Sequence, residues 1–376
     1  MTSSQQRPEY GRTLAQPFLA LNLDGAGDHP AAREPEAGQA AAHSGRRLAT
    51  RVQAAEAGGF QAITFADGAL DARATTHPGR LAGIHAAAYA GPLTRRAALI
   101  PVADVVYTEP FHLATQLMSL DFVTRGRAGW IVYGTGEEIE ARTVGREVAD
   151  AARVKREVVD AIEVARRTWD SWEDDAEIRD VATGRFLDAD KIHYVDFEGE
   201  NYSVKGPSIT PRPPQGQLPV LAPSDLVSAE AEVDGVLVAA DSVDALLEAA
   251  ATARDNGARI VIAEVAVALD ARGRAAADRL ATLDAETIWT PDTVLLSGTA
   301  AHVTSELARV LAAVDGVRLR PAEVDVDLPE LVNLVLPGLR RKTGLAETPV
   351  DGSFRDLLGL TRPASRYTAT TASKEN

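Results

Sequence analysis

Short apolar runs alternate with longer segments of helical periodicity along most of the chain. Eight runs have the length and composition of buried strands, and they cover residues 17–23, 61–67, 96–104, 127–135, 218–223, 234–240, 259–269 and 315–321. Eight such strands, each followed by a helical segment, predict a (β/α)8 TIM-type barrel, which is an α/β fold. A doubly wound open sheet is the main alternative, but no G-x-G-x-x-G motif follows the first strand.

The pattern predicts a single barrel domain over residues 1–362, with an insertion at about 173–217 between the fourth helix and the fifth strand. The helix before the insertion is predicted over roughly 137–172, because Val154, Val158 and Ile162 form an apolar stripe. The insertion is rich in Gly, Pro and Asp, and it contains a candidate β-hairpin, 193–197 with 201–205. The polar tail, 363–376, is predicted to be disordered.

Composition excludes several classes of function. The chain has 376 residues, a formal net charge of −15 and no cysteine. A nucleic-acid partner is not expected, because phosphate binding needs clusters of Lys and Arg. Disulfides, thiolate metal sites and Cys nucleophiles are excluded, and the seven histidines form no H-x-x-x-H or H-E-x-x-H motif, so no metal site is predicted. The N-terminus does not resemble a signal peptide, and no window is apolar enough to cross a bilayer, which predicts a cytoplasmic protein without a membrane partner.

Several blocks of the sequence resemble one known family in the same order. They include YTEPFHLATQLMSLDFVTRGRAGW (107–130), AAEAGGFQAITFAD (54–67) and FEGENYSVKGPSITPRPPQGQLPVL (197–221). The resemblance extends over roughly 17–345 and is to the bacterial luciferase-like, flavin-dependent monooxygenases, in the branch of nitrilotriacetate and alkanesulfonate monooxygenases. It implies a TIM-type barrel that usually forms a homodimer. It also implies that reduced FMN, supplied by a separate flavin reductase, activates O2 to oxidise a small organic substrate; other branches use coenzyme F420.

The resemblance implies where a flavin would lie, since the active sites of such barrels are at the carboxyl ends of the strands. Asp24 and Gly25 follow the first strand, and Ala103 ends the third, where relatives place small or hydroxyl residues beside the flavin. The next residue, Asp104, departs from this pattern, because a carboxylate repels an anionic reduced flavin. The sequence therefore predicts Asp24, Gly25 and Ala103 as cofactor contacts.

The fourth strand departs from the family at the position that touches the flavin ring. Relatives carry an Asn there that hydrogen-bonds the ring edge, and the corresponding residue is Ile131, which has no polar group in its side chain. Tyr133 and Thr135 are the candidates to replace it. Phe111, Leu117 and Met118 in the preceding segment are candidates for a dimer contact, with packing inside the chain as the alternative.

The phosphate-binding loop also departs from the family. Relatives follow the fifth strand with Gln-Ala-Gly-x-Ser and a helix, whose backbone N–H groups and Ser hydroxyl hold the FMN phosphate. Here Pro223, which has no N–H, stands at the glycine, Ser224 stands at the serine, and Asp225 adds a negative charge. Arg153, near the start of the long helix, is a second candidate for the phosphate, with a solvated helix face as the alternative.

The sequence supports a main hypothesis and two alternatives. The main hypothesis is a monooxygenase that uses reduced FMN and O2. The first alternative is a degenerate family member that has lost tight flavin binding and acts as a binding or partner subunit. The second is an F420-dependent oxidoreductase. The changes at Ile131, Pro223 and Asp225 predict weak FMN binding at best, and the pattern singles out no catalytic residue.

Overall fold

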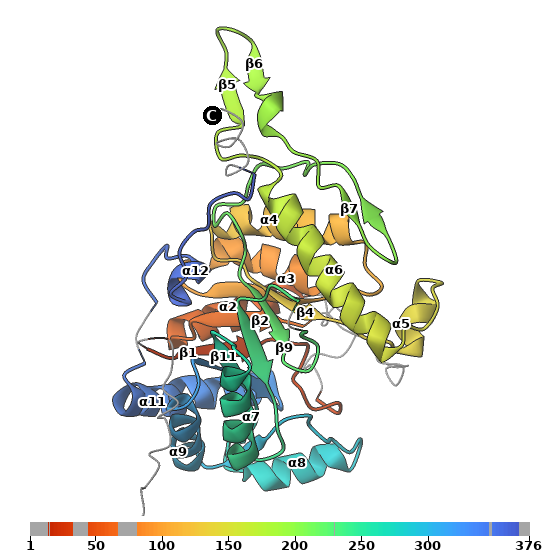
Figure 1. Ribbon diagram of the computed structural model, residues 1–376. Coiled ribbons are helices and arrows are strands. Elements are labelled where there is room, and N and C mark those ends of the chain that lie inside the picture. The colour runs from red at the N-terminus through yellow and green to blue at the C-terminus, as the bar shows by residue number, and fades with distance from the viewer. Residues whose placement is uncertain are drawn as a thin grey trace, which may run out of the picture. The chain divides into compact units, whose positions relative to one another are not determined.

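The protein folds as a (β/α)8 barrel, as the strand pattern predicts. The computed structural model describes residues 14, 16–32, 44–66, 81–228, 230–345 and 348–367 (Figure 1). All eight predicted strands are present: β1 (Phe18–Asn22), β2 (Ala62–Phe65), β3 (Ala98–Asp104), β4 (Trp130–Tyr133), β9 (Val220–Pro223), β10 (Gly235–Val238), β11 (Val261–Leu269) and β13 (Gly316–Pro321). One further strand, β12 (Leu295–Gly298), pairs with β11 and is not part of the predicted set.

Helices separate most of the strands. They are α2 (Gly45–Gly58), α3 (Gly83–Ala90), α4 (Pro110–Thr124), α5 (Glu138–Thr143), α6 (Ala151–Asp170), α7 (Val243–Asp255), α8 (Ala276–Asp284), α9 (Ala300–Leu311), α10 (Val324–Glu330), α11 (Leu336–Thr343) and α12 (Phe354–Leu357). The helix predicted over 137–172 is divided into α5 and α6, and Gly145 adopts a positive φ of 68° between them. Among the residues that the structure describes, no helix is both long enough and apolar enough to cross a membrane.

The chain divides into two compact units. Unit 1 comprises Met1–Ala20, Gly27–Ala32 and Gly235–Ala346, and unit 2 comprises Leu21–Ala26, Arg33–Asp234 and Glu347–Asn376. The single domain over 1–362 stays a prediction from the sequence.

Unit 1 is built around β11, whose nine residues are all buried. β13 lies along one edge of β11, and β10 and β12 follow one another along the other edge, all in parallel orientation. Helices α7, α8 and α9 also contact it. Apart from the buried Glu264, its residues are all Val, Ile, Ala or Leu, and such a largely apolar run predicts a buried strand without alternation.

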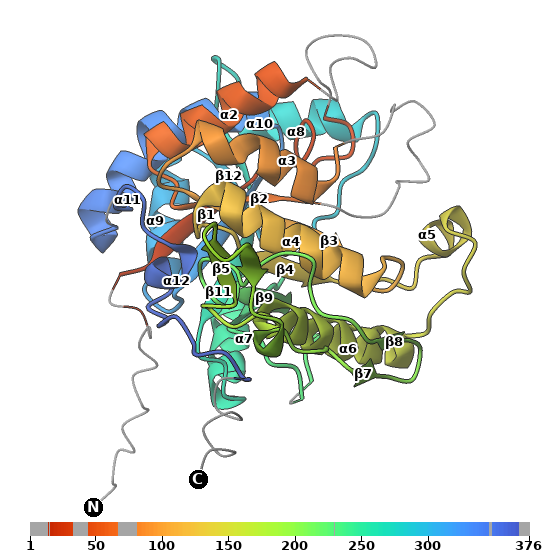
Figure 2. The same cartoon turned by 90° about the horizontal axis from the view of Figure 1, so that it is seen from above.

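Unit 2 contains the parallel strands β9, β4, β3 and β2 in that order. Helices α4 and α6 lie side by side within this unit (Figure 2). The predicted apolar stripe of α6 is buried, and Trp169 from α6 meets Trp130 of β4 edge to face at 6.4 Å. Leu117 and Met118 of α4 are fully buried in this packing, so the alternative in which they pack inside the chain is the correct one.

The insertion of unit 2 forms two hairpins. The predicted hairpin is confirmed by β7 (Phe197–Glu198) and β8 (Ser203–Val204), although its strands are shorter than expected. A second hairpin, β5 (Glu177–Asp180) with β6 (Arg185–Leu187), stands away from α4 and α6 (Figure 1).

Residues 363–367, which the sequence assigns to the disordered tail, make defined contacts in unit 2. The Ser365 hydroxyl donates to the carbonyl of Asp170, and the Arg366 N–H donates to the Asp170 carboxylate. The Tyr367 ring stacks on His193 at 4.6 Å. The rest of the predicted tail, 368–376, lies outside the described residues.

Candidate active site

The carboxyl ends of β1, β2, β3, β4 and β9 all belong to unit 2, and they bring the sequence-predicted residues of this unit together. Parallel pairing places Asp104 next to Tyr133 and Ala103 next to Val132. The ends of β3 and β4 therefore lie side by side, as a barrel requires for residues that act on one ligand.

The end of β3 lines a cavity of about 230 Å³. Ala103 and Asp104 form its floor, and His85, Tyr107 and Gln116 are among the other residues that line it. The carboxylate of Asp104 accepts a hydrogen bond of 2.7 Å from the backbone N–H of Tyr107. This bond closes the turn that leads to α4, so Asp104 has a local structural role.

The end of β4 carries two hydroxyl groups. Burial raises the pKa of Tyr133, and a hydrogen bond with the Thr135 side chain acts in the opposite direction. Thr135 is buried and accepts a hydrogen bond from the N–H of Glu137 at 3.1 Å. Tyr133 therefore carries a neutral phenol at neutral pH, able to donate or accept a hydrogen bond.

Helix α6 packs directly against the end of β4. A methyl group added at Gly134 would lie 3.1 Å from Val154 Cγ1 and 3.2 Å from Val158 Cγ2. Because this surface of α6 is aliphatic, it gives the end of β4 an apolar wall and no hydrogen-bonding group.

The end of β1 is fixed by contacts that sequence reasoning does not find. Asn22 is buried, and its side-chain oxygen accepts a 3.0 Å hydrogen bond from the Thr64 hydroxyl of β2. The carbonyl of Gly25 accepts a 2.7 Å bond from Arg51 of α2, while Asp24 is half-buried. A polar residue inside an apolar strand, as at Asn22 and Thr64, is the signal that marks such positions.

The two candidates for the phosphate lie in different surroundings. Ser224 is exposed in the turn after β9. Arg153 lines a second cavity, of about 490 Å³, between α4, α6 and the β7–β8 hairpin. Its guanidinium is 3.3 Å from the carboxylate of Glu157, a buried residue whose pKa is raised by burial. Neither candidate lies on the cavity at the end of β3.

No group of three or more His, Asp and Glu side chains able to hold a metal ion occurs within the described ranges. The cavity at the end of β3 is lined by Ala103 together with polar and ionisable side chains, among them Asp104, Gln116 and Glu140. The hydroxyl groups of Tyr133 and Thr135 belong to the neighbouring end of β4 and are not among its lining residues.

Comparison with known proteins agrees with this arrangement. The chain matches the family described as luciferase-like monooxygenase over residues 28–292. N-acetyl-S-(2-succino)cysteine monooxygenase of Bacillus subtilis (strain 168) is 33% identical over 61% of this chain and 52% of that protein. Nitrilotriacetate monooxygenase component A of Aminobacter aminovorans is 34% identical over 44% of this chain and 36% of that protein. The chain thus spans about half, or less, of the length of these two relatives.

Solved structures share the fold. A long-chain alkane monooxygenase superposes with a TM-score of 0.77 over 92% of this chain and 96% of the other, at 18% identity. At this identity the likeness concerns the barrel alone. The family match, in contrast, is a match of sequence that covers more than half of the chain and includes the ends of β2, β3, β4 and β9. The chain belongs to the luciferase-like monooxygenase family.

Proposed function

We propose that this protein is a flavin-dependent monooxygenase that oxidises a small organic substrate with O2. The observation that carries the proposal is the family match over residues 28–292, together with two relatives at 33% and 34% identity that are named as monooxygenases. When bound, the reduced flavin supplies the electrons with which O2 is activated, and the protein binds, orients and shields the reactants.

The ends of β3 and β4 suit the ring system of a flavin. Ala103 presents only a methyl group to its cavity, so a planar ring can approach the strand closely. Tyr133 and Thr135 offer hydroxyl groups for the polar edge of the ring, in place of the family Asn that Ile131 replaces. Asp24 and Gly25, after β1 of the same unit, are proposed as the neighbouring loop of the site.

The described residues fit the phosphate of FMN less well than its ring system. Ser224 and Arg153 stay the candidates that the sequence predicts. Yet Ser224 is followed by Asp225 in an exposed turn, and Arg153 is paired with Glu157. Among the residues that the structure describes, the ends of β3 and β4 offer a surface for the ring, but neither Ser224 nor Arg153 forms a ready cradle for the phosphate.

The partners follow from the same family. We propose that a separate flavin reductase supplies the reduced flavin, a proposal supported by the word "component" in the name of the Aminobacter relative. A homodimer and a cytoplasmic location stay predictions from the sequence. Of the three dimer-contact candidates, Phe111 also packs on the chain itself, against the core around Val164 and Phe197.

The alternative functions have weaker support. A degenerate subunit without flavin would explain the changes after β9, but it gives no role to the cavity at the end of β3. The F420 alternative is less well supported, because the two sequence relatives described above are named as monooxygenases.

Titration of the protein with reduced flavin under anaerobic conditions tests the proposal, followed through quenching of its four tryptophans. We expect saturable binding by the unmodified chain. Ala103→Leu is expected to weaken binding at least about tenfold, since the longer side chain enters the cavity that the ring would occupy.

Ala152→Leu is the matched control, because Ala152 is exposed on α6 and outside the cavity. It should leave flavin binding unchanged, and both variants should unfold at the same temperature as the parent. If the unmodified protein shows no saturable binding of reduced flavin, the monooxygenase proposal fails and the partner-subunit alternative is favoured.

A further inference from the structure

Strand β9 leads into a turn instead of a helix. After Pro223 the chain makes short turn bonds, from the N–H of Leu226 to the Pro223 carbonyl, from Ala231 to Ser228 and from Val233 to Ala231. Residues 224–228 and 230–234, which the structure describes, contain no helical turn. Because phosphates bind at helix N-termini through unpaired backbone N–H groups and the helix dipole, this junction lacks both sources of attraction.

Further along the segment after β9, Glu232 and Asp234 are tied to the first residue of β9 and to α6. The N–H of Asp234 donates to the carbonyl of Val220, and the Asp234 carboxylate accepts from the N–H of Val220. Arg166 of α6 donates to the carbonyl of Glu232 and pairs with Asp234 at 3.0 Å. Within unit 2, these contacts fix the chain beside the first residue of β9, whereas the turn at 224–226 follows its last residue.

The two long helices after β3 and β4, α4 and α6, are capped by carboxylates, whereas the short helix α5 between β4 and α6 has no side-chain cap. At α4, the first residue is Pro110, which has no N–H, and the Glu109 carboxylate accepts from the N–H groups of Phe111 and His112 at 3.2 and 2.5 Å. At α6, the Asp150 carboxylate accepts from the N–H of Arg153 at 2.7 Å. These caps stabilise the helices and place negative charge where a phosphate would have to lie.

The cation nearest to these termini is already neutralised. Arg153 pairs with Glu157, and the cavity that it lines also holds Glu109 and Glu147 against a single further cation, Arg146, among its lining residues. A phosphate entering this cavity would meet more negative than positive side chains.

At the end of β13 in unit 1, an arginine is likewise already paired with carboxylates. Both sides of the Arg320 guanidinium are engaged: Nε and Nη2 donate to the two carboxylate oxygens of Asp28, at 3.0 and 2.9 Å, and Nη1 donates to Asp292 at 2.5 Å. A bidentate pair with a carboxylate occupies the same donors that a phosphate would use.

We propose that this chain recognises its flavin through the ring system and not through the 5′-phosphate, so that it binds FMN and riboflavin with nearly equal affinity. The proposal rests on the proposed function. A phosphate carries nearly two negative charges at neutral pH, and without a cradle it stays in solvent and contributes little.

Parallel titrations of the full chain with FMN and with riboflavin, at low and high salt, test this proposal. We expect the two dissociation constants to agree within about threefold, and FMN binding to be unchanged or slightly stronger at high salt, because salt screens repulsion by the carboxylates. FMN binding at least about tenfold tighter than riboflavin binding, and weakened by salt, would overturn it.

Two variants make the test specific to the predicted phosphate ligands. Arg153→Ala and Ser224→Ala should leave the ratio of the two affinities unchanged, and riboflavin serves as the internal control for any general effect on folding. A selective loss of FMN affinity in either variant contradicts the proposal. If neither flavin binds, the proposed function fails as well, and this outcome differs clearly from a preference for FMN.

Discussion

Replacing Arg212 by alanine is expected to lower the free energy of unfolding by about 3–5 kcal/mol, because it removes the closest cationic partner of a buried aspartate. Arg212 lies in the insertion of unit 2, and its side chain is only 1% exposed. Its Nε and Nη2 donate to Asp170 at 2.9 and 2.8 Å, and Asp170 is 3% exposed. Without the Arg212 cation, the negative charge of Asp170 loses its closest positive charge in a region that solvent does not reach.

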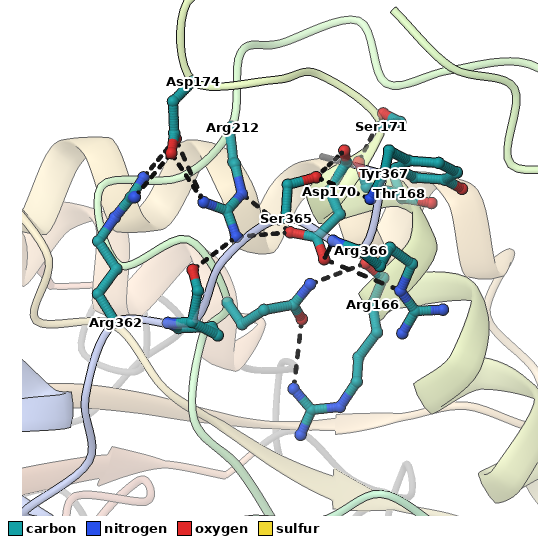
Figure 3. Close-up of polar contacts among 12 residues, drawn as sticks. Arg166, Thr168, Asp170, Ser171, Asp174, Arg212, Arg362, Ser365, Arg366 and Tyr367 are labelled. Atoms are coloured by element: carbon teal, nitrogen blue, oxygen red, sulfur yellow. Dashed lines mark hydrogen bonds and ion pairs between the residues drawn. The ribbon is translucent and has the colours of Figure 1, made fainter. Parts of the chain in front are cut away.

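The arginine also joins three distant segments. Figure 3 shows Arg212 between Asp170, at the end of α6, and Asp174, while Arg362 reaches the same Asp174 carboxylate from the other side. Arg212 Nη2 also donates to the carbonyl of Pro363 at 2.9 Å. The substitution thus removes the one side chain that contacts Asp170, Asp174 and Pro363 together, while Arg362 and Arg366 keep their own contacts with Asp174 and Asp170.

Arg362→Ala is the matched control for this prediction. Arg362 makes a bidentate pair with Asp174, but its side chain is 45% exposed, so its loss should cost no more than about 1 kcal/mol. Chemical denaturation of the two variants and the parent measures both values. Equal, small losses would show that solvent reaches Asp170 in solution and that the cluster adds little stability.

The barrel is more predictable from the sequence than this cluster is. Buried strands such as β11 are recognisable as largely apolar runs, and the periodic stripe of α6 predicts which face is buried. β12 is missed because its apolar run, 294–296, is only three residues long and lies between Thr293 and Ser297. Arg212 and Pro363 are 151 positions apart, and no local pattern reveals that such residues meet.

The candidate site, like the fold, could be predicted from the sequence only in part. Resemblance to a family points to Ala103, Tyr133 and Thr135, and the structure brings their strand ends together. Whether they contact a flavin stays a prediction. Pro223 and Asp225 are visible in the sequence as departures from the family. The lack of a helix in the described residues 224–228 and 230–234 is not, because periodicity alone does not distinguish a short helix from a turn.

A second expected result concerns the pH dependence of stability. Asp121 of α4 is fully buried, and burial raises its pKa from 3.8 to about 6, against hydrogen bonds from Gln215 and from the N–H of Ala128. The carboxyl accepts the Gln215 N–H at 3.1 Å and the Gln215 amide at 2.6 Å. The amide oxygen of Gln215 in turn accepts from the N–H of Arg355, next to the start of α12.

The sign of the effect follows from the direction of this shift. A carboxyl whose pKa is higher in the folded state than in the unfolded state contributes stability below pH 4, and this stability is lost as the pH rises through about 6. The change from 3.8 to about 6 corresponds to about 3 kcal/mol. Asp121→Asn removes the titration, so the stability of the parent relative to this variant should fall by about 3 kcal/mol between pH 4 and 7.

Asp174→Asn, in the same unit, is a control for which the pH dependence of stability should have the opposite sign. The hydrogen bond from Arg362 lowers the pKa of Asp174 to about 2, so the contribution of this carboxylate is present above pH 4 and is lost as the pH falls toward 2. Denaturant unfolding of the three proteins across pH 3–7 should show one difference curve that falls with increasing pH and one that rises. A flat curve for Asp121→Asn would mean that the donors from Gln215 and Ala128 offset the cost of burying the charge, and that Asp121 is ionised throughout this range.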